Sequence, residues 1–186
     1  WVGDTVVMGC GNEVVVLDAS SWTERETIPL VSGVERLTLS PDETRLLIGE
    51  ESGRIALWDL AGRREITHRA PGEAAITLLL CRWDTGQVFS GDKDGRLVRW
   101  FPERDGPVTE MHVFPAPVSR KCFLTRADTQ LVAFGNSDSV RARMSAGFVH
   151  LWDTTDGRLV QRLGENSDLW CNAAALSSDG AFLASA

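Results

Sequence analysis

Two short apolar runs flank a polar turn in the stretch Val88-Phe89-Ser90-Gly91-Asp92-Lys93-Asp94-Gly95-Arg96-Leu97-Val98-Arg99-Trp100. The dipeptide Asp94-Gly95 between two β-rich runs predicts a β-hairpin, because the turn requires a positive φ that glycine adopts without steric cost. The same pattern occurs earlier, in Leu46-Leu47-Ile48-Gly49-Glu50-Glu51-Ser52-Gly53-Arg54-Ile55-Ala56-Leu57-Trp58-Asp59. In both copies the first glycine precedes the tryptophan by nine residues (49 to 58 and 91 to 100). The hairpin is therefore a repeated unit of the chain.

The ends of the predicted third strands recur at a nearly constant spacing. The aligned pairs are Leu17-Asp18, Trp58-Asp59, Trp100-Phe101 and Trp152-Asp153, with steps of 41 (17 to 58), 42 (58 to 100) and 52 (100 to 152). A period in the low forties with four short strands per unit is typical of a β-propeller blade. One twisted sheet cannot bury both of its faces alone, so neighbouring units must stack around an axis.

These units predict an all-β fold, a partial β-propeller ring of about four to five blades of four-stranded antiparallel sheet. The approximate blades are 1–30 (partial, without its opening strand), 31–70, 71–116, 117–165 and 166–186 (partial). The second hairpin of the fourth unit is interrupted, because its two glycines are 12 residues apart (135 to 147) instead of 4 (49 to 53, 91 to 95). Such a set of units is too small for the usual closed ring. We expect the sequence to be a piece of a longer propeller, with closure by self-assembly as the alternative.

Composition excludes several classes of protein. The 186 residues carry a net charge of −7, with 43% hydrophobic and 24% charged residues, as in soluble globular proteins. The negative charge argues against broad binding to nucleic acid or to an anionic membrane surface. The cysteines Cys10, Cys81, Cys122 and Cys171 form no C-x-x-C pair, so we expect free thiols in a reducing, cytoplasmic compartment rather than zinc or disulfides.

The repeated motifs resemble the WD40 repeat family over essentially the whole chain. The resemblance is carried by Leu57-Trp58-Asp59, Arg99-Trp100, Leu151-Trp152-Asp153, the turns Ser40-Pro41-Asp42 and Ser177-Ser178-Asp179-Gly180, and the hairpin Ser90-Gly91-Asp92-Lys93-Asp94-Gly95. It implies a propeller that serves as a binding platform, with the hairpin between second and third strands on the face called the top. Trp58, Asp59, Trp152 and Asp153 are accordingly expected to be structural blade residues.

The family also implies a hydrogen-bonded tetrad of Trp, Ser or Thr, Asp and His in many blades. The third unit supplies Trp100, Ser90 and Asp94, but no Gly-His pair precedes any unit at the expected place. The tetrad is incomplete, so we expect these blades to depend more on apolar packing than on a polar lock.

No catalytic pattern is present in the sequence. His68, His112 and His150 are not spaced with carboxylates or cysteines as a metal site or a catalytic triad requires. The sequence contains no G-x-S-x-G, Walker-type or H-E-x-x-H motif. The prediction is a protein that is not an enzyme and that uses no metal or cofactor.

Two features are candidates for partner binding. The insertion between Asn136 and Ala146 contains Arg141, Arg143 and Met144, which suit an acidic or phosphorylated peptide, with Asp92 and Lys93 from the neighbouring hairpin. The alternative for this segment is a tolerated insertion without function. The second feature is an aromatic residue beside polar turn residues, Trp83 and also Trp22, which suits a binding hot spot or, alternatively, a cover over the adjacent strand.

The function predicted from these features is a non-catalytic scaffold of the WD40 type that binds a protein or peptide through its top-face loops. The alternative is the regulatory or sensory propeller of a larger signalling enzyme, a kinase or NTPase whose catalytic domain lies outside this segment. A nucleic-acid scaffold ranks last, because 26 acidic residues outnumber 19 basic ones. No membrane partner is expected.

Overall fold

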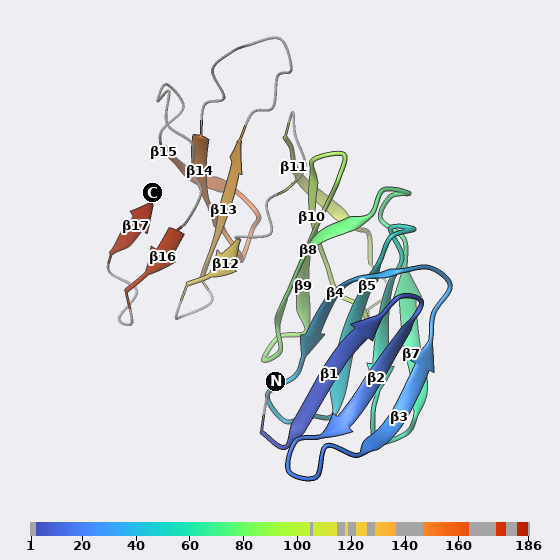
Figure 1. Cartoon of the computed structure of the whole chain (residues 1–186). Helices are drawn as coiled ribbons and strands as arrows, with labels where there is room; N and C mark the ends of the chain where they lie inside the picture. The colour runs from blue at the N-terminus through green and yellow to red at the C-terminus, as the bar shows by residue number, and fades with distance from the viewer. Residues whose placement is uncertain are drawn as a thin grey trace.

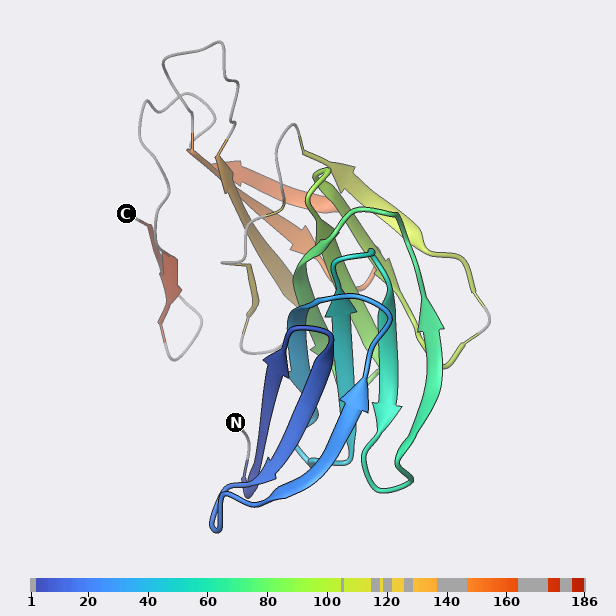
Figure 2. The same cartoon turned by 45° about the vertical axis from the view of Figure 1, so that its right-hand side comes forward.

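The computed structural model describes residues 3–104, 106–114, 118, 122–125, 129–136, 147–163, 174–177 and 182–185. Within these residues the secondary structure consists of strands in five antiparallel sheets. The sheets follow one another in chain order around an open arc (Figures 1 and 2). The predicted fold class, an all-β partial propeller, is confirmed.

Strands pair with their neighbours in sequence within every sheet. The first sheet contains β1 (Thr5–Cys10), β2 (Glu13–Asp18) and β3 (Glu24–Pro29). The second contains β4 (Val34–Leu39), β5 (Arg45–Glu50), β6 (Ile55–Asp59) and β7 (Arg64–Arg69). The third contains β8 (Ile76–Arg82), β9 (Gln87–Asp92), β10 (Arg96–Trp100) and β11 (Thr109–Val113).

The remaining two sheets follow in the second half of the chain. The fourth contains β12 (Phe123–Leu124), β13 (Gln130–Asn136), β14 (Gly147–Asp153) and β15 (Leu159–Leu163). The fifth contains β16 (Ala174–Leu176) and β17 (Leu183–Ser185).

Apolar side chains fill the seams between neighbouring sheets. On β5 the side chains of Leu46 and Ile48 pack toward the first sheet, whereas Leu47 packs toward the third. This alternation follows from the period of two along a strand. The sheet is therefore buried on both faces, and each fully buried aliphatic side chain contributes roughly 1.5–3 kcal/mol relative to exposure.

Glycine allows neighbouring sheets to approach closely. A Cβ atom on Gly49 of β5 would lie 2.8 Å from Cγ2 of Ile76, and one on Gly91 of β9 would lie 2.6 Å from Cβ of Val118. Either distance is shorter than a normal contact, so a side chain would push away β8 of the next sheet at Gly49 and the link before the fourth sheet at Gly91. The close approach explains why this glycine is repeated in the sequence.

The innermost strands are joined across a seam by side-chain hydrogen bonds. Arg36 Nε of β4 donates to the carbonyl oxygen of Thr77 at 2.6 Å, and Thr38 Oγ1 donates to that of Leu79 at 3.0 Å. Both acceptors lie in β8. These bonds fix the second sheet against the third.

Candidate functional site

The strands run between two rims of loops, which Figure 2 shows at the upper and lower ends of the first three sheets. The top rim is defined as the β1–β2, β5–β6 and β9–β10 hairpins with the links between sheets. The bottom rim is defined as the β2–β3, β4–β5, β6–β7, β8–β9 and β14–β15 turns. The predicted binding residues divide between these two rims.

The β9–β10 hairpin on the top rim is held by the carboxylate of Asp92. Its Oδ1 accepts hydrogen bonds from the backbone N–H of Asp94 at 3.0 Å and of Arg96 at 2.9 Å. Burial raises the pKa of Asp92, and the two backbone hydrogen bonds oppose that shift. Asp92 is only 5% exposed, so its predicted role in contacting a partner is corrected to a structural one.

Lys93 is the exposed cation of this hairpin. Its backbone N–H donates to the carbonyl oxygen of Ala75 at 3.0 Å, which fixes the main chain. Its ammonium group lies 3.1 Å from the carboxylate of Glu35 in β4, with 52% of the lysine side chain exposed. Lys93 is accessible to a partner, and its role in partner binding stays a prediction.

The insertion is only partly described. Asn136 at the end of β13 pairs with Gly147 at the start of β14, so the insertion connects these two strand ends. Arg141, Arg143 and Met144 lie outside the described residues.

A buried ion pair on the top rim was missed by the sequence reasoning. Glu50 is 0% exposed, and its carboxylate accepts from Nη1 of Arg54 at 2.6 Å and from the backbone N–H of Ser32 at 2.9 Å. Arg54 also pairs with Glu65 of β7. Beside the apolar packing that was expected to dominate, this blade therefore contains a polar lock, which ties the link before β4 to its own hairpin.

A sequence signal for this lock exists. The pattern Gly-acid-x-x-Gly-Arg occurs at 49–54 and again at 91–96. In the second copy Nη1 of Arg96 donates to the carbonyl oxygen of Pro71 at 2.9 Å. In each copy the acid holds the hairpin and the arginine ties it to surrounding structure.

The tetrad suggested by the family resemblance is present only as a pair. Trp100 is 2% exposed, and its Nε1 donates to Oγ of Ser90 at 3.3 Å. Asp94 is exposed on the hairpin, so its expected place in a buried tetrad is corrected. Trp152 is 3% exposed and belongs to a buried apolar cluster, and the half-buried Trp58 packs against another.

The aspartates that follow the third strands cap the turns of the bottom rim. Asp59 Oδ1 accepts from the backbone N–H of Gly62 at 2.9 Å, and Asp153 Oδ1 accepts from that of Thr155 at 2.7 Å. The hydrogen bond from Thr155 lowers the pKa of Asp153.

Trp83 lies on the bottom rim, at the opposite end of β9 from Lys93. Its half-buried ring packs against the apolar seam between the second and third sheets. It also lines a 210 Å³ cavity with Phe101, Glu103 and Arg104, in which the Arg104 guanidinium lies 4.4 Å from the centre of the Phe101 ring. The geometry favours the alternative interpretation of Trp83 as a cover over the adjacent strands.

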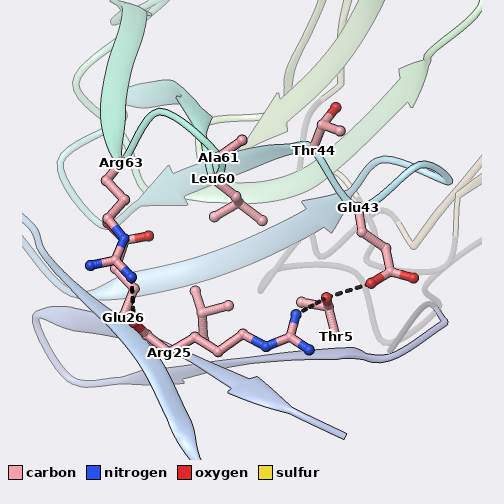
Figure 3. Close-up of a pocket in the computed structure, with 9 residues that line it drawn as sticks. Thr5, Arg25, Glu26, Glu43, Thr44, Leu60, Ala61 and Arg63 are labelled. Carbon is pink, nitrogen blue, oxygen red and sulfur yellow. Dashed lines mark hydrogen bonds between the residues drawn. The ribbon is translucent and has the colours of Figure 1, made fainter.

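A larger cavity of 290 Å³ opens on the bottom rim between the first and second sheets (Figure 3). The first sheet contributes one wall and the β4–β5 and β6–β7 turns contribute the other. The lining residues are Thr5, Val16, Arg25, Glu26, Glu43, Thr44, Leu60, Ala61 and Arg63.

A chain of hydrogen bonds crosses this cavity. Nη1 of Arg25 donates to Oγ1 of Thr5 at 3.2 Å, and that hydroxyl donates to the carboxylate of Glu43, as Figure 3 shows. Arg25 also pairs with Asp18, which raises the pKa of Arg25. Nη2 of Arg63 contacts the carbonyl oxygen of Arg25 at 3.4 Å. The cavity therefore has a fixed polar wall.

No metal site is found in the described ranges: no group of three or more His, Cys, Asp or Glu side chains could hold an ion there. His112 and His150 have ring centroids 5.8 Å apart in the seam between the third and fourth sheets. Cys10, Cys81 and Cys122 are free thiols, and Cys171 lies outside the described residues. Among the residues that the structure describes, no helix has the length and apolar character needed to cross a membrane.

Comparison with known proteins supports the fold. No family model and no curated protein matches the sequence. A chain in the crystal structure of a mitotic checkpoint complex is similar, with a TM-score of 0.80 and 17% sequence identity. The match covers 100% of this chain and 54% of that chain, so the chain spans about half the length of the solved chain it matches. At this identity the likeness establishes the β-propeller architecture.

Proposed function

We propose that this chain is part of a WD40-type propeller and acts as a non-catalytic scaffold that binds a protein or peptide on its top rim. The observation that carries the proposal is the rigid β9–β10 hairpin. Hydrogen bonds to Asp92 and Ala75 hold its backbone, while Lys93 and Asp94 remain exposed at its tip. A loop that is already ordered loses little conformational entropy when a partner binds.

The two ends of the insertion, Asn136 and Gly147, support a place for it on the same rim. It connects β13 to β14, and the hairpin with Lys93 connects the corresponding strands β9 and β10 of the third sheet. Arg141 and Arg143 would add charge-assisted hydrogen bonds to an acidic or phosphorylated segment, and Met144 would add an adaptable apolar contact. The similar solved chain comes from a multi-protein complex, which supports protein partners in general.

The test compares proteins captured from an extract of the organism that encodes the chain. The bait is either the wild-type chain or the variant Arg141→Ala/Arg143→Ala. We expect at least one captured protein to be depleted roughly tenfold by the double substitution, the effect of losing charge-assisted bonds. Titration calorimetry with that purified protein then checks the loss directly.

Arg158→Ala provides a matched control, because Arg158 is 73% exposed in the β14–β15 turn of the bottom rim. This control should capture the same proteins as the wild type. Equal affinity of the partner for the wild type and for the double variant would show that the top-rim assignment is wrong.

A further inference from the structure

Backbone strain is concentrated on the bottom rim near the 290 Å³ cavity. Among the described residues, three that are not glycine have a positive φ: Trp22 at 57°, Glu43 at 60° and Arg63 at 50°. They lie in the β2–β3, β4–β5 and β6–β7 turns, which Figure 2 shows at the lower end of the first two sheets. Residues with a Cβ atom are destabilised in this region, and such strain persists where another requirement maintains it.

The internal repeat provides the reference for this strain. Asp18 and Asp153 each begin an equivalent turn, in which Trp22 N donates to Asp18 O at 2.8 Å and Gly157 N donates to Asp153 O at 2.9 Å. Gly157 has φ of 77° at the position that Trp22 occupies in the first sheet. Arg63 stands at the same distance from Asp59. Two large side chains therefore occupy a turn position that glycine fills without strain.

Contacts within the chain account for Glu43 but not for the other two residues. Glu43 accepts hydrogen bonds from the hydroxyl of Thr5 and from the backbone N–H of Asp4, and so joins the first two sheets. Trp22 is 63% exposed. Arg63 is exposed, and its described hydrogen bond is the long one to the carbonyl oxygen of Arg25. Among the described residues, no hydrogen bond or ion pair of the Trp22 or Arg63 side chain compensates for the backbone strain at these positions.

We propose that Arg63 and the cavity it lines, together with Trp22 on the β2–β3 turn of the same rim, form a second docking site for an extended peptide segment of a partner protein that has an acidic side chain next to an apolar one. This site is on the opposite rim from the proposed top-rim site and does not depend on it.

Charge defines the expected chemistry of the ligand. The carboxylate of Asp18 is paired with Arg25, and that of Asp59 accepts from Gly62 and lies 3.9 Å from Arg64. Arg63 has unused guanidinium donors that match a carboxylate of the ligand in a two-point contact. Glu26 also lines the cavity, and its carboxylate can only accept hydrogen bonds, so it suits an N–H donor of the peptide backbone.

The apolar part of the ligand has a matching surface. Leu60 and Val16 line the cavity and belong to the buried seam between the first two sheets. Trp22 is presented on a turn that Asp18 Oδ1 fixes by accepting from the backbone N–H groups of Ser20 and Ser21, both at 3.0 Å. An exposed tryptophan on an ordered turn, three residues before the cavity-lining Arg25, is a typical anchor of a binding surface.

A random linear heptapeptide library displayed on phage provides the probe. Selection on the 186-residue chain, with counter-selection on the variant Trp22→Gly/Arg63→Gly, should enrich peptides with Asp or Glu next to an apolar residue. A synthetic peptide from this set should bind Arg63→Gly about tenfold more weakly or worse, as expected for a lost charge-assisted contact. No enrichment over the double variant, or enrichment of basic peptides, would overturn the proposal.

Thermal stability separates recognition from a structural role. Glycine relieves the strained φ, so Trp22→Gly and Arg63→Gly should each raise the melting temperature by about 2–4 °C while weakening peptide binding. A lower melting temperature for both variants would show that the side chains serve the fold and would overturn the proposal. The variant Arg141→Ala/Arg143→Ala should bind the selected peptide like the wild type, so this test stands apart from that of the top rim.

Discussion

Replacement of Arg54 by methionine is expected to destabilise the protein strongly, although the change keeps a long unbranched side chain. The substitution removes the guanidinium that donates to Glu50 at 2.6 Å and to Glu65. Glu50 is 0% exposed and would keep only its hydrogen bonds from Ser32. Removal of one partner from a buried ion pair typically costs about 3–5 kcal/mol, because the other charge stays buried without compensation.

The expected loss lies at the low end of that range. The side chain of Arg54 is 18% exposed, so water reaches part of the site and screens the remaining charge. We expect the free energy of unfolding to fall by about 3 kcal/mol. Urea unfolding followed by tryptophan fluorescence gives this value from the midpoint and the slope of the transition.

A matched control is available at an exposed ion pair. Arg45 lies 2.8 Å from Glu103, and these two side chains are 43% and 44% exposed. Arg45→Met should change the free energy of unfolding by about 0–1 kcal/mol, as is usual for surface ion pairs.

A double substitution identifies the cause. Glu50→Leu/Arg54→Met removes both charges and should recover at least about 1 kcal/mol, with a residual loss from the unpaired N–H of Ser32. If Arg54→Met costs no more than Arg45→Met, or if the double variant is as unstable as the single one, then the buried charge does not control stability here.

Three further predictions follow from the seams and the thiols. Gly49→Ala should lower the free energy of unfolding by about 1–3 kcal/mol through overpacking, whereas Gly106→Ala, with no atom within 4 Å of the added Cβ, should be neutral; urea titration would reveal any reversed order. Burial lowers the pKa of His112 below 6.5, so the unfolded chain binds this proton more tightly than the folded one. The free energy of unfolding should therefore fall as the pH drops through about 6.5. A His112→Gln variant that retains the whole pH dependence would contradict this. Burial raises the pKa of the Cys81 thiol to about 12, so iodoacetamide at pH 8 should label exposed Cys10 first, and mass spectrometry of the modified peptides would expose the opposite order.

The architecture was predictable because the same strand and turn motifs repeat along the sequence at a nearly constant spacing. The spacing of Trp58, Trp100 and Trp152, together with the Asp-Gly and Ser-Pro-Asp turns, identified sheets of four short strands and the missing first strand of the first sheet. These signals are local in sequence and repeat in register. Local turn chemistry and strand alternation are the patterns that a single sequence expresses most directly.

The polar interactions were less predictable, because their partners come from different sheets. The sequence suggested Asp94 as the buried carboxylate, whereas the structure buries Asp92 two residues earlier. The repeated Gly-acid-x-x-Gly-Arg pattern was visible in the sequence. Its structural role depends on partners outside the pattern, which are Ser32 and Glu65 for the first copy and Pro71 for the second. A single side-chain rotation moves a turn residue between solvent and interior, and spacing alone does not determine it.

The bottom-rim cavity was outside the reach of sequence reasoning for a related reason. One wall comes from the three strands of the first sheet and the other from two turns of the second sheet, and these walls meet only after the two sheets pack together. Trp22 was identified as an unusual turn residue, but Arg63 resembled any exposed arginine. Trp22 and Arg63 differ from other turn residues because each stands at the position that Gly157 occupies in the fourth sheet. An alignment of the repeats, strand by strand, reveals this replacement of glycine.

Gly49 and Gly91 show that positions in the seams and positions in the turns tolerate mutation differently. At those glycines the backbone closely approaches Ile76 of the next sheet and Val118 of the link before the fourth sheet, deep in the seams. Turn residues such as Trp22 and Arg63 stand outside those contacts. Mutation can therefore rewrite what the rims recognise while the curvature of the arc stays constant, whereas one added methyl group in a seam would displace every sheet that follows it.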